Sequence, residues 1–190
     1  LNVTRGGENL KDIIYYNTDF RYTYKGSMMV SPSIYYNRTN NAVSMGYIYD
    51  KSTGRRTVTP ASINGNWRAG AGLSLSGALD KKRLLVFSNN LNADFVNSAD
   101  YIGSDEAKPM GKSIVKTWNV SERLRLDYKI GRLSIGFSGT FSWLRSASDM
   151  AAFSTINAYN YNYGLTGMVV LPGEVNLSTD ITMYSRRGYE

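Results

Sequence analysis

The amino-acid sequence predicts an all-β protein, folded as an antiparallel up-and-down meander of about eight long strands. Three observations support this fold: apolar and polar residues alternate with a period of two, the alternating segments are long, and the connections between them differ in length. Residues 133–143 show the alternation most clearly, because apolar or aromatic residues stand at 133, 135, 137, 141 and 143, with serines and Thr140 between them. A period of two places successive side chains on opposite faces, so each strand is expected to have one apolar and one polar face.

The alternating segments are longer than ordinary strands. Several span about 14 to 17 residues, whereas strands of soluble proteins usually have about 5–6 residues. Residues 1–19 are expected to form an external loop or an extra strand, and the segment 20–50 is interrupted by Gly26 and Pro32. Residues 1–190 are predicted to form one partial domain, with strands at about 20–36, 42–50, 62–79, 83–99, 114–129, 132–147, 157–171 and 174–187.

Tight turns and longer polar links connect the predicted strands in turn. The tight turns centre near residues 39, 81, 130 and 172, and the first of them is expected at 37–41. Their spacings of about 42, 49 and 42 residues are typical of up-and-down hairpins. Short turns at one end of a sheet and long loops at the other are typical of bacterial outer-membrane β-barrels. The longer links are expected at 51–61, 100–113 and 148–156.

The positions of the tryptophans also favour a membrane barrel. Trp67, Trp118 and Trp143 each lie toward the long-link end of a predicted strand, where the aromatic residues of barrels gather at the membrane interface. Backbone polar groups in hydrocarbon need partners within the protein, so only helices and closed sheets cross a membrane. The predicted strands are therefore interpreted as part of an outer-membrane β-barrel, with the apolar face toward lipid and the polar face toward a wet lumen.

Two other readings of the same pattern stay open. A soluble β-sandwich or small barrel also alternates apolar and polar residues. The alternative is therefore a soluble all-β ligand- or glycan-binding module, in which Tyr159, Tyr161 and Tyr163 could form a stacking platform. A complete eight-stranded structural barrel, filled by its own side chains, is a third possibility.

The composition argues against an enzyme. Cys and His are absent, which removes thiol chemistry, the commonest metal ligand and the commonest general base. No catalytic or metal-binding residue is therefore predicted, no cofactor is expected, and the ligand-binding residues remain unknown. The net charge of +7 is spread along the chain and forms no basic stripe, so nucleic acid is not an expected partner.

Charged residues at polar positions of the strands are expected to form ion pairs. Asp94, Asp127 and Asp180 fall on the polar face of their strands, and Arg123 and Arg125 lie nearby on the same face. Ion pairs that line a lumen are the simplest interpretation of this set.

Three further features of the sequence have structural interpretations. Residues 70–72 (GAG) are expected to be strand glycines, because no helix follows to complete a dinucleotide-binding loop. Asp105 and Glu106 are expected to be a solvated acidic pair. Glu122 falls on the apolar face, where a carboxylate is unfavourable. A bulge near residues 121–123 or a position close to the membrane interface would explain it.

Five segments carry a resemblance to a known family. They are residues 56–60 (RTVTP), 64–67 (NGNW), 79–82 (LDKK), 157–164 (NAYNYNYG) and 178–189 (STDITMYSRRGY). These segments resemble the barrel of TonB-dependent-receptor-like outer-membrane proteins, in which a carboxypeptidase-regulatory-like domain and a plug often precede the barrel. The resemblance covers most of residues 27–190.

The resemblance implies a receptor or transporter in the outer membrane of a Gram-negative bacterium, which binds and imports a nutrient in a TonB-dependent way. Its partners would be outer-membrane lipid, a small or oligomeric nutrient, and, in the full-length protein, a plug domain and TonB. The chain starts at Leu1 without a secretion signal and stops in mid-pattern at residues 187–190, so we expect a piece of a longer precursor. Such a fragment, studied alone, is expected to self-associate.

Overall fold

The structure, a computed structural model, describes residues 2–4, 6–7, 10–102, 104–105, 111–150 and 153–188. These residues form thirteen β-strands and no helix, which confirms the prediction of an all-β fold. Among them, no helix therefore has the length and apolar character needed to span a membrane.

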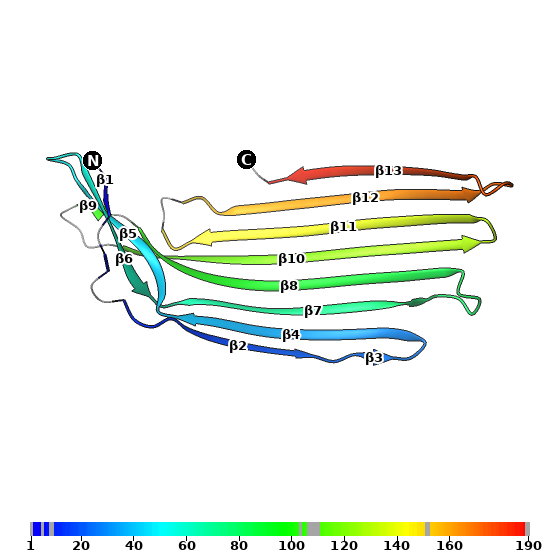
Figure 1. Ribbon diagram of the computed structural model, residues 1–190, viewed down its shortest axis with the longest axis horizontal. Helices are drawn as coiled ribbons and strands as arrows, with labels where there is room; N and C mark the ends of the chain where they lie inside the picture. The colour runs from blue at the N-terminus through cyan, green and yellow to red at the C-terminus, as the bar shows by residue number, and fades with distance from the viewer. Residues whose placement is uncertain are drawn as a thin grey trace.

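Most of the strands form one long antiparallel sheet, the main sheet, in which each strand lies beside the next in a meander (Figure 1). The short strand β3 (Tyr24–Lys25) extends β2 along the edge of β4. The order across the sheet is β13 (Asn176–Arg187), β12 (Ile156–Val170), β11 (Leu133–Ser148), β10 (Gly111–Ile130), β8 (Leu85–Ile102), β7 (Asn66–Ala78), β4 (Met28–Asn40) and β2 (Ile14–Arg21).

A second, smaller sheet lies beyond one end of the main sheet (Figure 1). Its centre is the antiparallel hairpin of β5 (Ala42–Asp50) and β6 (Arg55–Ile63). The short strands β1 (Asn2–Thr4) and β9 (Ser104–Asp105) flank the hairpin, and each pairs with it in parallel. The chain thus leaves the main sheet after β4 and returns to it at β7.

The link predicted at residues 51–61 is wrong, because most of it is strand β6. Thr57, Val58 and Thr59 are all β-branched, and such side chains suit a pleated strand. Their polar neighbours had suggested a loop. The link predicted at 100–113 is shorter than expected, because β8 continues to Ile102 and β10 begins at Gly111.

The turn predicted at 37–41 is also wrong. Strand β4 runs through these residues to Asn40, and the true turn is Gly26–Ser27, inside the strand predicted at 20–36. Asn37 pairs with Asn17 on one side and with Arg68 on the other, so strand pairing overrides the local turn tendency of asparagine. As a consequence, residues 42–50 belong to the second sheet, and the extra strand at 14–21 is the eighth long strand of the meander.

The short connections of the main sheet all lie at the end opposite the second sheet (Figure 1). They comprise residues 26–27, 79–84, 131–132 and 171–175. Gly131 (φ 57°) and Gly173 (φ 81°) adopt the left-handed backbone that these tight turns need. In the β7–β8 turn, the Asp80 carboxylate accepts a hydrogen bond from the Leu85 backbone N–H (2.8 Å), which lowers the pKa of Asp80.

The main sheet is a single layer with almost no core. Among the described residues, only Ile63, Ala99 and Ala158 are buried apolar residues. Large apolar side chains of the outer strands stay exposed, for example Leu177 (62 %) and Ile181 (63 %). No second layer of described protein covers the apolar face, so backbone pairing between strands is what holds the sheet together.

The β5–β6 turn supplies a pH-dependent contact. Asp50 accepts hydrogen bonds from the hydroxyl of Ser52 (2.6 Å), from Thr53 and from their backbone N–H groups, and these bonds lower its pKa from 3.8 to about 2. Because the folded pKa is depressed, the contribution to turn stability is complete above pH 3.8 and is lost as the pH falls toward 2.

We predict that S52A raises the Asp50 pKa toward 3.8, measured by NMR of the carboxyl carbon, whereas the distant control S76A leaves it unchanged. An equal pKa in the S52A variant and the parent would contradict this assignment.

Candidate functional site

The polar face of the main sheet carries two neighbouring rows of hydrogen-bonding side chains that cross five strands, from β8 to β13. Residues in each row are direct partners on adjacent strands, and alternate residues of one strand lie on one face. The first row contains Asn92, Ser121, Ser142, Asn160 and Arg186. The second contains Asn90, Arg123, Thr140, Asn162 and Tyr184.

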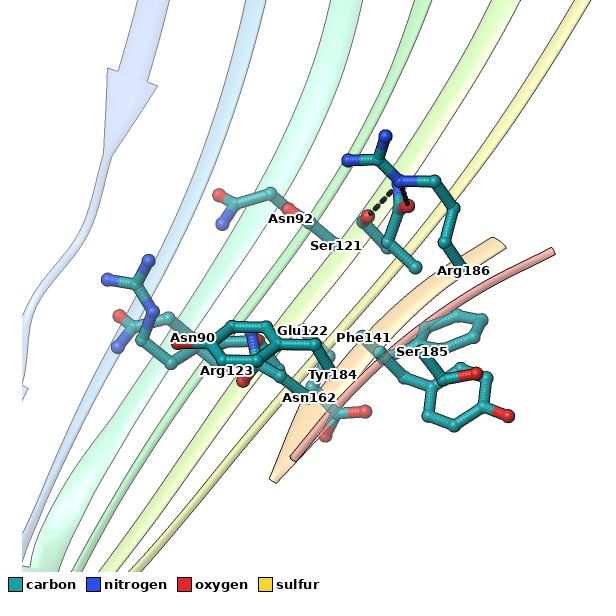
Figure 2. Close-up of a pocket in the computed structure, with 14 residues that line it drawn as sticks. Asn90, Asn92, Ser121, Glu122, Arg123, Phe141, Asn162, Tyr184, Ser185 and Arg186 are labelled. Atoms are coloured by element: carbon teal, nitrogen blue, oxygen red, sulfur yellow. Dashed lines mark hydrogen bonds between the residues drawn. The ribbon is translucent and has the colours of Figure 1, made fainter. Parts of the chain in front are cut away.

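These two rows line a hollow of about 780 Å³, the Asn/Arg hollow (Figure 2). Its volume lies within the roughly 300–1,000 Å³ that small-molecule sites occupy. Amide and hydroxyl groups make up most of its polar surface, and Arg123 and Arg186 are its two cations. Glu122 also borders the hollow, but it belongs to the alternate set of β10 residues, whose side chains lie on the apolar face.

Hydrogen bonds fix part of this surface. Arg186 donates through Nε to Asn160 Oδ1 (3.1 Å), and Asn160 Nδ2 donates to Ser142 Oγ (3.4 Å). On the other flank, Ser74 Oγ donates to Asn90 Oδ1 (2.7 Å). Arg123 makes no hydrogen bond or ion pair with any residue in the described part of the chain. One cation of the hollow is thus anchored to the sheet, and the other is exposed without a counter-charge.

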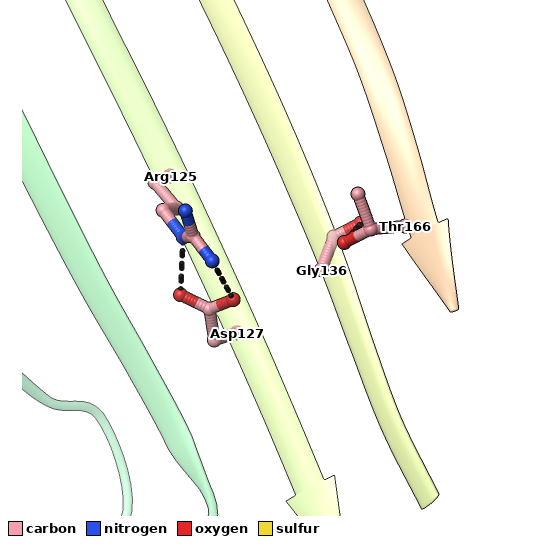
Figure 3. A network of polar contacts seen from close by, with 4 residues as sticks. All are labelled: Arg125, Asp127, Gly136 and Thr166. Carbon is pink, nitrogen blue, oxygen red and sulfur yellow. Dashed lines mark hydrogen bonds and ion pairs between the residues drawn. The ribbon is translucent and has the colours of Figure 1, made fainter. Parts of the chain in front are cut away.

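A second hollow, of about 790 Å³, lies on the same face nearer to the short turns. Its charges include both signs. Arg125 forms two hydrogen bonds with Asp127, from Nε to Oδ2 (2.7 Å) and from Nη2 to Oδ1 (3.0 Å) (Figure 3). Asp180, Lys129 and Arg83 complete its charged lining. The two hollows therefore differ in chemistry, although they lie on the same strands.

The structure settles where the predicted ion pairs form. The pair between Asp127 and Arg125 is confirmed. Asp94 pairs instead with Arg68 (3.0 Å), a residue of β7 that was not among the predicted partners. Asp180 accepts a hydrogen bond from Thr182 Oγ1 (3.1 Å) and lies in the second hollow with Asp127.

Arg68 is held by its neighbours on both sides. Its guanidinium lies 5.4 Å from the centre of the Tyr35 ring, and the same ring covers Gly70, where a Cβ would lie only 2.6 Å from the ring. Gly70 is therefore a strand glycine, as predicted, and it provides room for an aromatic ring from the next strand. The predicted acidic pair, Glu106 and the side chain of Asp105, lies outside the described residues.

The apolar face carries a row of aromatic rings near the end that bears the second sheet. Ring centres are separated by 6.1 Å between Tyr36 and Trp67, 5.0 Å between Trp67 and Phe95, and 4.7 Å between Phe95 and Trp118. These separations are typical of favourable aromatic pairs. The row runs across four adjacent strands, β4, β7, β8 and β10.

Trp143 lies on the same face on β11, and together with the row of rings on β4 to β10 it forms what we call the aromatic band. It is the direct cross-strand partner of Tyr159, and its indole N–H donates to Asn157 Oδ1 (2.7 Å). Tyr159, Tyr161 and Tyr163 alternate on β12 and share the face of Trp143, so they belong to the apolar face, although Tyr161, like Glu122, also borders the Asn/Arg hollow. All three tryptophans lie toward the end of the sheet that sequence reasoning predicted.

Glu122 lies on the apolar face, as its position in the alternation predicted. The pairing of β10 with β8 and with β11 runs without a break through residues 121–123, which excludes the proposed bulge. The carboxylate accepts a hydrogen bond from Asn89 Nδ2 (2.7 Å), which projects from β8 on the same face. Sequence reasoning missed Asn89, although it occupies an apolar-face position between Phe87 and Leu91.

The Asn89–Glu122 contact yields a testable prediction. In N89L the carboxylate loses its partner, so the free energy of unfolding is expected to fall by about 1–3 kcal/mol. The double variant N89L/E122L removes both polar groups and is expected to recover at least the parent stability. Denaturant unfolding in the medium that keeps the protein folded would measure both values.

The matched control uses Asn90, the next residue, which lies on the opposite face. A cycle of N90L with E122L is expected to be additive, because the two side chains do not meet. Additivity in the Asn89–Glu122 cycle as well would show that the hydrogen bond contributes nothing.

Comparison with known proteins identified no relative of this chain. No protein-family model matches the chain, and no curated protein and no solved structure matches it. Among the described residues, no group of three or more Asp or Glu side chains could hold a metal ion. Conclusions about function therefore depend on the two faces of the main sheet.

Proposed function

We propose that the chain forms part of the wall of an outer-membrane β-barrel receptor, which binds a nutrient and imports it in a TonB-dependent way. The observation that carries the proposal is the contrast between the two faces of the main sheet. One face is apolar, banded with aromatic rings and covered by no described protein. The other is polar and contains both hollows.

The exposed surface supports a lipid neighbour. The chain exposes 13558 Å², whereas a compact monomer of 21.2 kDa is expected to expose about 9,000 Å². Much of the excess belongs to strands whose apolar residues face outward, such as Leu165, Leu177 and Ile181. Exposing this apolar surface to water is energetically unfavourable, whereas contact with hydrocarbon has no such cost.

Backbone pairing is compatible with that environment. The interior strands of the main sheet, from β4 to β12, pair on both sides, so their backbone polar groups need no water. The edges of β2 and β13 lack a partner among the described strands. Pairing of these two edges, with each other or with further strands, would close the wall.

The two ends of the sheet suggest an orientation. In outer-membrane barrels, short turns face the periplasm and longer connections face the outside. By this rule, the turns at 131–132 and 171–175 are periplasmic, and the second sheet with its β5–β6 hairpin stands outside the cell. The aromatic band then lies at the outer interface of the membrane.

The resemblance to TonB-dependent-receptor-like proteins is what adds import to this proposal. It makes the polar face the lumen side of the wall, along which a nutrient passes after a plug domain is displaced with the help of TonB. On this proposal, the amide, hydroxyl and charged groups that line the two hollows bind cargo as it passes.

The proposal predicts both location and sidedness. The whole protein that carries this chain, expressed in a Gram-negative host, is expected to fractionate with the outer membrane and to need detergent for extraction. Because the chain contains no cysteine, single cysteines report on each face. F137C is expected to resist a water-soluble maleimide in membranes, whereas S138C, the next residue on the opposite face, should react.

A whole protein that stays fully soluble would overturn this proposal. It would favour the soluble ligand- or glycan-binding module instead, with Tyr159 and Tyr163 exposed and Tyr161 half-buried between them on the uncovered face. Equal labelling of F137C and S138C in purified membranes would likewise exclude a lipid contact for the apolar face.

The isolated chain of 190 residues is expected to self-associate in water. Two unpaired strand edges and an uncovered apolar face each favour association. Analytical ultracentrifugation without detergent should show oligomers or aggregates, and detergent should reduce them. A monodisperse monomer in plain buffer would contradict this expectation.

A further inference from the structure

We infer that the Asn/Arg hollow binds a small polar ligand that carries a carboxylate or phosphate group. The inference deepens the proposed function and rests on it for one point only, that such a ligand is cargo of the receptor. Binding itself follows from the side chains that line the hollow.

The Asn/Arg hollow is positively charged on the polar face of the sheet. The two rows of the hollow contain Arg123 and Arg186 and, on that face, no acidic side chain. The nearest acids along the sheet are already engaged, since Asp94 pairs with Arg68 and Asp127 pairs with Arg125. No carboxylate among the described residues forms an ion pair with Arg123, and none lies in the two rows of the hollow.

The hydrogen-bond donors of the hollow lie on neighbouring strands. Arg123 on β10 and Arg186 on β13 are three strand spacings apart, or about 14 Å between backbones. They occupy adjacent rows, and their long side chains extend over the sheet. Between them lies a floor of amides and hydroxyls formed by Thr140, Ser142, Asn160 and Asn162.

This arrangement matches a particular kind of ligand. A guanidinium presents paired N–H donors that fit the oxygens of a carboxylate or a phosphate. Amide and hydroxyl groups both donate and accept, so the floor suits a hydrogen-bonding body attached to that acid group. The bond from Arg186 Nε to Asn160 Oδ1 fixes one guanidinium at the edge of the floor, which reduces the ordering cost of binding.

The second hollow offers a built-in comparison. Arg125 lies two residues from Arg123 on the same strand and the same face, but it forms two hydrogen bonds with Asp127. An incoming anion would have to compete with that carboxylate. Arg125 is therefore the matched control for Arg123, with the same charge and nearly the same place in the sheet.

The test is isothermal titration of the whole detergent-purified protein with citrate and, separately, with inorganic phosphate. Citrate presents several carboxylates and a hydroxyl group, phosphate presents only the phosphate oxygens, and glycerol serves as a neutral polyol. We expect R123Q to weaken binding of the preferred anion about 10- to 100-fold, R123K to weaken it less, and R125Q to change it less than about twofold. Glycerol should not bind measurably.

Folding controls accompany the titrations. Each variant should show the same circular dichroism spectrum as the parent and the same electrophoretic mobility of the folded protein in detergent. If R125Q fails to fold, K129Q replaces it as the control. Equal losses in R123Q and the control would indicate a general effect of net charge and would overturn the inference. Absence of binding by both anions to the parent protein would also overturn it.

These outcomes are separate from those of the proposed function. A protein that fractionates with the outer membrane but binds neither anion would refute the ligand class and leave the receptor intact. A soluble protein that binds citrate through Arg123 would refute the receptor and leave the anion site intact.

Discussion

The backbone hydrogen-bond ladder of the main sheet is the interaction on which the rest of the structure depends. Seven antiparallel pairings join the eight strands from β2 to β13, and almost no apolar core supports them. A ladder also imposes a strict period of two on the side chains, so one choice of register sets both faces. The aromatic band and the Asn/Arg hollow are thus two consequences of the same pairing.

The alternation in the sequence predicted the six strands of the main sheet from β7 to β13. In these strands, apolar and polar residues alternate regularly enough to assign the two faces. The alternation also gave the bounds of β5 (Ala42–Asp50) correctly, but it failed at the turn predicted at 37–41 and the link predicted at 51–61, where Asn37 and Thr57 lie in strands. In the candidate site, alternation placed Asp94, Arg123 and Asp127 on one face. It could not show that Asp94 pairs with Arg68, because that contact depends on the stagger between β7 and β8.

The two faces of the main sheet satisfy their charged and polar side chains in different ways. On the hollow side, charges and amides can share contacts with one another and with water, so a cation such as Arg123 can stay without a counter-charge at little cost. On the apolar side, the one carboxylate that the described sheet carries there, Glu122, has a dedicated donor in Asn89. A single amide therefore makes this acid tolerable where its neighbours are Leu91 and Phe141.

The free edges of the sheet have an arithmetic consequence. Seven reversals of direction separate β2 from β13, so these two strands run opposite to each other. A ring that is antiparallel throughout can then be completed by joining the two edges directly or by inserting strands in pairs. An odd number of added strands would force one parallel seam, so the eight strands described here specify an even total for a fully antiparallel cylinder.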